Sequence, residues 1–371
     1  MAQLTRLIRV RLRRDERGAV AIIVALFIGG GVLTGMAALV IDVGQLYQER
    51  SELQNGADAA ALGVAKSCAL GSCTAAVAAQ LADANASSLT GGNAAVDLVC
   101  GSGDLGNCPA STGTLADCPS APPAGTNFVD VHTSTLTASG STLLPPVFAQ
   151  TVLGNSSYQG TNVQACAQAE WGPPSTATTV ALTISACEWD QATDQGTDFA
   201  PAPPYSQGGL PATSFDQVLS LTPGPGNDNG CTTEPAGADG VDTFGWAADA
   251  TGNCTLAVSA ATFPGSAGNT MSTSCQSVLQ NAQQSQVPIL VPVYVSFDSG
   301  SDTYALHGFA DFVVTGYNLP GGFEAQDWLD QANSCQGTVY CLNGYFVQGL
   351  IPTTGSITGP SLGASVIDLT G

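Results

Sequence analysis

The sequence has few basic residues, and all of them lie near its N-terminus. Of 371 residues only eight are Lys or Arg, against 29 Asp or Glu, and no basic residue follows Lys66. Six of the 29 acidic residues precede residue 67, which leaves 23 on residues 67–371. Binding of nucleic acid depends on Lys and Arg that neutralise phosphates, and an acidic surface also repels anionic lipid headgroups. Nucleic acid is therefore excluded as a partner, and the charge favours solubility.

Groups suited to catalysis are equally scarce. The chain has two histidines, His132 and His307, no lysine after Lys66 and no G-x-S-x-G sequence. Hydrolysis requires a nucleophile, a base and an orienting group. His307 and Asp311 fall on one face of a predicted strand, but at about 3.3 Å per residue their Cα atoms are about 13 Å apart. No glycine-rich loop is followed by a phosphate-binding lysine. The sequence therefore predicts no catalytic residue, no cofactor site and no enzyme.

All 12 cysteines follow residue 66, and none forms a C-x2-C pair. An even number confined to one region is typical of disulfides, whereas zinc sites use closely spaced cysteines, usually with histidines. We therefore expect disulfides and no metal site. Twelve cysteines allow on the order of ten thousand pairings, so the connectivity stays open. Proximity alone suggests Cys68 with Cys73 and Cys335 with Cys341.

Residues 19–41 contain no charged residue and follow six arginines. At about 1.5 Å per helical residue this run covers about 34 Å, enough to cross a bilayer. A cleaved secretory signal is the rival interpretation, but its apolar part is only about 7–15 residues long. Basic flanks stay on the cytoplasmic side. We therefore expect a cytoplasmic segment 1–18, a single transmembrane helix 19–41, and everything after it outside the cytoplasm.

Two glycines in this run, Gly31 and Gly35, form a G-x-x-x-G sequence, which lets transmembrane helices approach closely. They are candidates for helix association, including self-association into a homo-oligomer. Glycine is also simply frequent in membrane spans.

Residues 42–66 continue the helix with apolar or small residues at three- and four-residue spacing, the pattern of an amphipathic helix. No proline occurs between residues 1 and 108, so nothing forces a break at the membrane surface.

The rest of the chain, 67–371, carries the two-residue alternation of β-strands at 163–171, 179–186, 287–297 and 304–314. We expect two hairpins, one from each consecutive pair. Pro288 and Pro292 predict that their strand is an edge strand or is interrupted there. Segments 85–127 and 190–286 are expected to be irregular, apart from a short helix near residue 280. The predicted fold class is α+β: a long N-terminal helix, then one acidic, cysteine-rich, antiparallel β-rich domain with long disulfide-tied loops.

Three short sequences carry a resemblance to a known family: Arg17-Gly18 before the apolar run, Ile41-Asp42-Val43-Gly44 at its end, and Leu53-Gln54-Asn55-Gly56-Ala57-Asp58-Ala59-Ala60-Ala61-Leu62 beyond it. Over about 50 residues the chain resembles the Tad-type, TadE/TadG-like membrane proteins associated with Flp pilus assembly. The resemblance implies a bacterial, membrane-anchored protein of pilus biogenesis.

The sequence departs from two motifs found in members of this family, one for cleavage and one for metal binding. Prepilin-like members that are cut after a glycine have a glutamate at the fifth mature position, where cutting after Gly18 would place Ile23, so this cleavage is not expected. Some larger relatives carry a D-x-S-x-S metal site. The nearest sequence here, at 298–302, has Gly300 in place of the first Ser and predicts a hairpin turn instead.

These observations predict a non-catalytic, single-pass envelope protein of Flp/Tad-type pilus assembly. Its anchor helix would engage pilus-assembly membrane proteins or pseudopilin-like subunits. The alternative is a membrane-anchored surface adhesin or ligand-binding protein.

Overall fold

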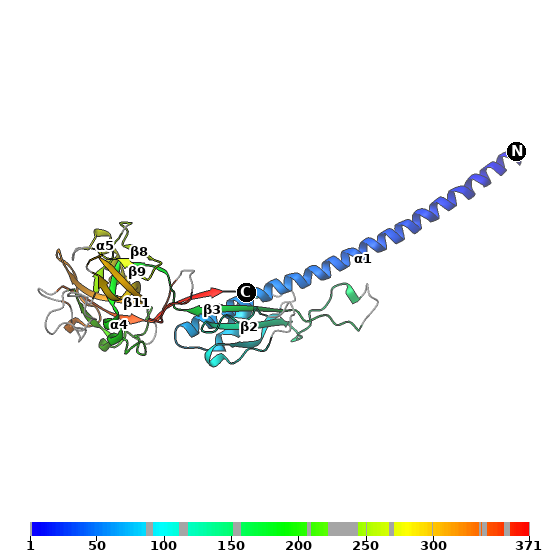
Figure 1. Ribbon diagram of the computed structural model, residues 1–371. Helices are drawn as coiled ribbons and strands as arrows, with labels where there is room; N and C mark the ends of the chain where they lie inside the picture. The colour runs from blue at the N-terminus through cyan, green and yellow to red at the C-terminus, as the bar shows by residue number, and fades with distance from the viewer. Residues whose placement is uncertain are drawn as a thin grey trace.

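The computed structural model describes residues 2–86, 92–110, 118–150, 157–205, 209–221, 244–249, 251–266, 271–298, 300–333, 335, 340–351 and 357–370, with side chains described from residue 20. It shows one long helix, α1 (Ala2–Ala69), followed by a β-rich region of mixed sheets (Figure 1). The α+β class expected from the sequence is confirmed. Residues 222–243 of the segment 190–286, which was expected to be irregular, lie outside the described residues.

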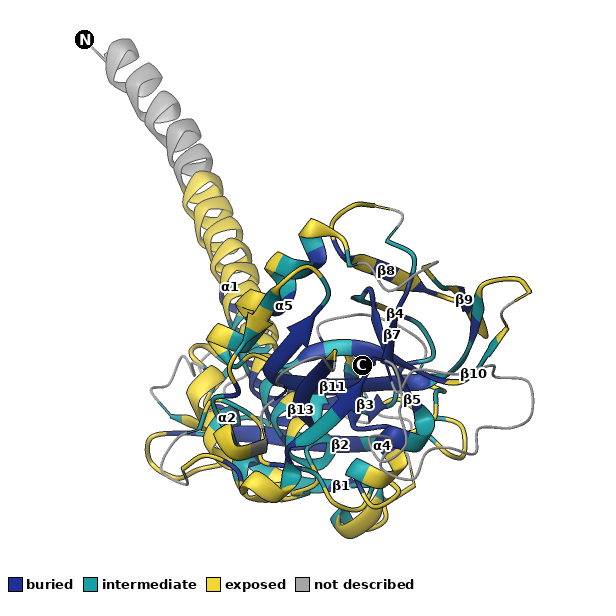
Figure 2. Ribbon diagram, turned by 90° about the vertical axis from the view of Figure 1, so that its left-hand side faces the viewer, coloured by how far each residue is buried: buried dark blue, intermediate teal, exposed yellow. Residues whose placement is uncertain are grey.

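The N-terminal half of α1 projects away from the rest of the molecule, and its large apolar side chains are exposed (Figure 2). A window of 18 residues in this part has a mean hydropathy of 2.3, and none of it is buried. By length and composition the helix can cross a membrane. It continues without interruption into the second half, as the lack of proline predicted.

The C-terminal half of α1 packs on a five-stranded sheet of order β1-β2-β3-β15-β14. A short second helix, α2, follows a 3₁₀ turn, η1 (Ala75–Val77), and packs against α1. The elements are α2 (Ala78–Asn85), β1 (Asn93–Gly101), β2 (Asn127–Leu136), β3 (Gln164–Gly172), β14 (Gly349–Leu350) and β15 (Ala364–Leu369). Small residues of α1 that are at most 2% exposed fill this first core, with valines of β2 and alanines of β3 opposite them. Alanine suits this place because it lets helix and sheet approach closely.

A second, larger sheet has the order β6-β13-β11-β10-β5-β7, with β9 and β12 also paired to β11. Its strands are β5 (Leu182–Ser185), β6 (Gln217–Ser220), β7 (Phe244–Trp246), β9 (Thr262–Pro264), β10 (Ile289–Asp298), β11 (Thr303–Leu319), β12 (Phe323–Ala325) and β13 (Cys341–Val347). A separate ribbon pairs β4 (Ala177–Val180) with β8 (Thr255–Val258). Helix α4 (Ala186–Ala192) contacts β5 and β10 of this sheet, and helix α5 (Thr273–Ser285) contacts β11. Helix α5 is the short helix expected near residue 280.

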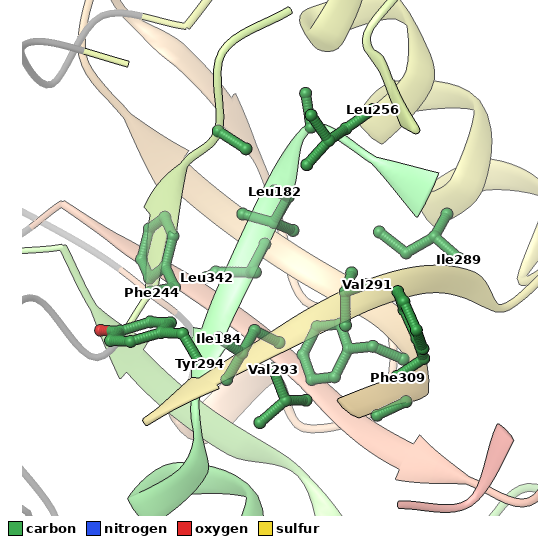
Figure 3. Close-up of a cluster of buried hydrophobic side chains, with 14 of the residues drawn as sticks. Leu182, Ile184, Phe244, Leu256, Ile289, Val291, Val293, Tyr294, Phe309 and Leu342 are labelled. Carbon is green, nitrogen blue, oxygen red and sulfur yellow. The ribbon is translucent and has the colours of Figure 1, made fainter. Parts of the chain in front are cut away.

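The larger sheet has its own core of branched and aromatic side chains (Figure 3). Leu182 and Ile184 of β5 lie beside Val291 and Val293 of β10, and all four are fully buried. The region expected to form one domain therefore contains two main hydrophobic cores, one for each sheet.

The C-terminal strand β15 connects these two parts (Figure 1). It runs parallel to β14 and antiparallel to β3, and its Val366 belongs to the larger core while Ile367 packs against the first. The last strand of the sequence therefore lies inside the sheet that carries α1.

One of the two expected hairpins is wrong. Strand β3 pairs with β2 and β15, whereas β5 pairs with β10 and β7, so the 163–171 and 179–186 segments belong to different sheets. Alternation identifies the buried face of a strand but not its neighbour. The Pro173-Pro174 linker carries the chain from one sheet to the other instead of turning it back.

The second hairpin, β10 with β11, is confirmed. Asp298 begins its turn and accepts hydrogen bonds from Gly300 N at 2.9 Å and Ser301 Oγ at 2.7 Å. On its other side β10 pairs with β5 only at Val293 and Tyr294, so among the described residues the part of β10 up to Pro292 has no partner strand on that side. The ladder with β11 runs through Pro292, and β10 is an inner strand, so the prediction of an edge strand is wrong. The expectation that 85–127 is irregular is wrong for β1, a strand of nine residues that pairs with β2. The same expectation for 190–286 is wrong for the short strands β6, β7, β8 and β9.

Five disulfides join described cysteines: Cys68–Cys73, Cys100–Cys108, Cys118–Cys166, Cys254–Cys275 and Cys335–Cys341. Cys187 is also disulfide-bonded. The two pairs suggested by proximity are among them. Cys118–Cys166 fastens the loop before β2 to β3, which is a disulfide-tied loop of the expected kind.

Candidate functional site

The part of α1 between residues 20 and 67, called the anchor helix below, holds most of the motif residues singled out in the sequence. Its second half is fixed to the first sheet by polar contacts as well as by the apolar core. Gln54 Nε2 donates to the carbonyl oxygen of Cys166 at 2.9 Å and to Asp58 Oδ1 at 2.8 Å. Thr133 Oγ1 of β2 donates to the carbonyl oxygen of Leu53 at 3.1 Å. The motif 53–62 thus binds the helix to β2 and β3.

Gly56 of the same motif is where α2 crosses the anchor helix. A Cβ atom placed on Gly56 would lie 2.8 Å from the carbonyl oxygen of Ala82 and 3.0 Å from Cβ of Ala86. The nearest of these atoms belongs to the backbone, which cannot rotate away as a side chain can. Glycine is therefore needed here for the close approach of two helices.

Asp42, directly after the apolar run, binds a segment more than a hundred residues away. Its Oδ1 accepts the backbone N–H of Val147 at 2.9 Å and of Phe148 at 3.0 Å, and its Oδ2 accepts Phe148 N at 3.2 Å. These are charge-assisted bonds, which are stronger than bonds between neutral groups. The sequence placed Asp42 at the end of the span but gave no sign of this partner, because nothing in the local pattern links positions 42 and 147.

The opposite face of the anchor helix is open. Tyr47 is 74% exposed, and Val43 and Leu62 are exposed as well. A Cβ atom placed on Gly31 or Gly35 would meet no atom within 4 Å, so within the described residues nothing of this chain covers them. The two glycines remain candidates for association with another helix.

Outside the anchor helix, a buried pair of carboxyl groups lies within the larger sheet. Thr315 Oγ1 donates to Asp216 Oδ1 at 2.7 Å and lies 3.3 Å from Asp327 Oδ2, and Asn343 Nδ2 donates to Asp216 Oδ2 at 3.4 Å. Burial raises the pKa of Asp216 to about 8, and a hydrogen bond to Asp327 adds to this shift. The raised pKa favours the protonated, uncharged form of the Asp216 carboxyl group at neutral pH.

The Asp216–Asp327 pair has a structural role in this arrangement. Asp327 Oδ1 accepts the backbone N–H groups of Leu329 at 2.7 Å and Asp330 at 2.9 Å, so the pair ties the segment after β12 to β11 and β13. Asp216 is 5% exposed and Asp327 is fully buried. No sequence signal marked the pair, whose members are far apart along the chain.

Asp311 of β11 is a second buried carboxyl group. It is 5% exposed, and burial raises its pKa to about 7. It lines a cavity of about 520 Å³ between the end of α1 and the larger sheet, together with Lys66, Gln348 and Ile351. The neighbour that the sequence suggested on its strand face, His307, is not among the residues that line this cavity.

His307 lies in strand β11, as expected, and His132 lies in strand β2. His132 Nε2 is 3.8 Å from Sγ of Cys118, and these two residues with Cys166 form a group of metal-ligand types, as do Cys100, Cys108 and Asp130. The cysteines of both groups are joined in disulfides, and a disulfide sulfur is not the thiolate that zinc binds.

Comparison with known proteins finds a family match over the anchor helix. Residues 18–67 match the family model Tad, described as "Putative Flp pilus-assembly TadE/G-like", which confirms the resemblance carried by the sequence motifs. No curated protein and no solved structure matches the chain. The family match therefore covers the anchor helix and does not extend into residues 68–371, the two-sheet region that follows it.

Proposed function

We propose that this protein is a non-catalytic, single-pass component of an Flp/Tad-type pilus-assembly apparatus, with its N-terminus in the cytoplasm and the two-sheet region outside. The family match supports involvement in Flp pilus assembly, and the exposed apolar helix supports a membrane location. The orientation rests on the arginines before the span. An oxidising exterior also agrees with the disulfides.

The observation that carries the proposal is that, in the segment that matches the family, one face of the helix is packed on the protein itself and the other face is exposed. One face of the anchor helix is fixed to the protein's own sheet through Leu53 and Gln54, and it contacts α2 at Gly56. The other face, with Tyr47 and Leu62, is exposed among the described residues and is apolar in part. A rigid helix that leaves the membrane with an open face is suited to contact other membrane-anchored subunits.

A non-catalytic role is supported by the surroundings of the titratable groups. The Asp216–Asp327 pair holds backbone N–H groups and a threonine, which accounts for its burial without a substrate. His132 lies beside a disulfide in the middle of a sheet.

Crosslinking in native membranes tests this proposal. A photo-reactive amino acid at Tyr47 is expected to capture pilus-assembly membrane proteins, identified by mass spectrometry, because this side chain points away from the protein's own sheet. The matched control is Tyr340, which is 39% exposed and lies in the larger sheet's half of the molecule, where no such capture is expected.

Self-association through Gly31 and Gly35 would appear in the same experiment as a crosslinked dimer that Gly31→Leu and Gly35→Leu remove. Capture of no pilus-assembly component at Tyr47, combined with tight binding of the protein to a purified matrix or host ligand, would contradict the proposal and favour an adhesin.

A further inference from the structure

The connection between β2 and β3 extends away from the sheet and runs beside α1 toward the N-terminus (Figure 1). We call the described residues of this connection, 137–150 and 157–163, the exit finger. Three large apolar side chains of the finger are exposed: Leu143 at 37%, Val147 at 53% and Phe148 at 41%. Soluble proteins show single exposed apolar residues, but three within six positions of one loop form a patch.

The finger has a defined structure. Leu144 is 2% exposed and belongs to the first core, and its backbone exchanges hydrogen bonds with Thr161 at 2.9 and 3.3 Å. The two sides of the finger are thereby joined near its base. Because Leu144 is fixed in the core, its neighbour Leu143 and the nearby Val147 remain exposed to the surroundings.

The contact with Asp42 fixes the depth of the finger relative to a membrane. Asp42 is the first charged residue after the apolar run, so it marks the level at which α1 leaves the hydrocarbon. Val147 and Phe148 donate to its carboxylate and therefore lie at the same level. One turn further into the apolar run Ala38 is only 8% exposed, whereas Leu39 and Val40 beside it are 65% and 69% exposed. One face of the helix is thus covered inside the apolar run.

The charge of the finger distinguishes it from the rest of the region. Residues 133–169 contain no Asp, Glu, Lys or Arg, although residues 67–371 carry 23 acidic residues. Anionic headgroups would repel an acidic loop at this level, but they do not repel the finger, because it carries no acidic residue. Backbone N–H groups that leave water also need an acceptor, because an unpaired one is costly in lipid. Asp42 provides that acceptor for two of them.

We propose that the exit finger is a second membrane contact of this protein: Leu143, Val147 and Phe148 insert into the interfacial layer of the bilayer that α1 crosses, with Asp42 as the clamp. The inference rests on the proposed crossing of the membrane by α1. Its consequence is a fixed angle between the two-sheet region and the membrane, since α1 and the finger contact the bilayer at two separate points.

Lipid crosslinking tests the inference on the full-length protein in native membranes. A diazirine-bearing amino acid at Phe148 is expected to form adducts of lipid mass. Phe27, which is 78% exposed in the apolar run, is the positive control, and Leu210, which is 53% exposed near the larger sheet, is the negative control. Lipid adducts at Phe27 but none at Phe148, or adducts of Phe148 with a protein or a second copy, would overturn the finger contact and leave the span intact. No lipid adduct at Phe27 would overturn both.

The hydrogen bonds of Asp42 to the finger are tested in the same experiment. Asp42→Ala removes the acceptor of both N–H groups and is expected to lower the lipid adduct at Phe148 severalfold while leaving the adduct at Phe27 unchanged. Asp83→Ala, which removes an exposed carboxylate of α2 away from the finger, is the control and is expected to change neither adduct. An unchanged adduct at Phe148 in Asp42→Ala would contradict the role of Asp42.

Discussion

Gly56→Leu is expected to lower the stability of the folded protein by about 2–3 kcal/mol, the cost of forcing a side chain into a filled helix contact. The first carbon of that side chain would lie 2.8 Å from the backbone oxygen of Ala82, so α2 has to move or α1 has to bend. Because α2 and α1 together close the first core, the loss is expected to spread to the whole five-stranded sheet.

Gly44→Leu is the matched control for this substitution. Both glycines lie in α1 and gain the same helix propensity on replacement, but a Cβ on Gly44 meets no atom within 4 Å. The measurement is thermal unfolding of the full-length protein in nanodiscs, followed by tryptophan fluorescence, to which Trp171 of the first core contributes. We expect a melting temperature roughly 5–10 °C lower for Gly56→Leu only. Equal melting temperatures for the two variants would refute the close-contact role of Gly56.

The second large effect concerns pH. Asp216 and Asp311 have folded-state pKa values of about 8 and about 7, above the value of 3.8 that applies to an unfolded chain. Between about pH 4 and pH 7–8 the folded protein keeps protons that the unfolded chain releases. Stability that is fully present below pH 4 is therefore lost as the pH rises, by up to about 1.4 kcal/mol per pH unit for each group. The protein should be more stable at pH 5 than at pH 8.

Asp216→Asn tests this pH dependence because an amide reproduces the shape and the donor of the protonated acid. We expect the variant to flatten the fall in stability between pH 5 and pH 8, measured by thermal unfolding with Trp328, the neighbour of Asp327, as one reporter. Asp298→Asn serves as the control, since Asp298 lies in an exposed turn and hydrogen bonds lower its pKa. If Asp216→Asn and Asp298→Asn show the same profile as the unmodified protein, Asp216 does not hold a proton in the fold.

The sequence predicted the features that depend on local patterns. An uncharged run after arginines, the absence of proline and the three- and four-residue spacing over 42–66 were enough for α1, and alternation was enough for β10 and β11. A turn of a few residues between those two strands also determined that they pair. These predictions succeed because each one depends on residues close together in the chain.

The features that sequence reasoning missed depend on distant residues. Strand β3 was assigned to a hairpin with its successor, but its partners are β2 and the C-terminal β15, and β15 has no local signal for that position. The contact of Asp42 with Phe148 and the pairing of Asp216 with Asp327 likewise join positions about a hundred residues apart. Strand β1 was missed because the Gly, Asn and Ala residues around it are typical of a loop. The strand forms because the backbone of β2 pairs with it along its whole length.

The proposed function depends above all on α1 crossing the membrane with its arginines inside and the two-sheet region outside. The most direct measurement is protease treatment of spheroplasts that carry the protein with one epitope tag at each end. We expect external protease to remove the C-terminal tag while the N-terminal tag survives until the membrane is permeabilised. Protection of the C-terminal tag in intact spheroplasts, or loss of the N-terminal tag before permeabilisation, would contradict this topology.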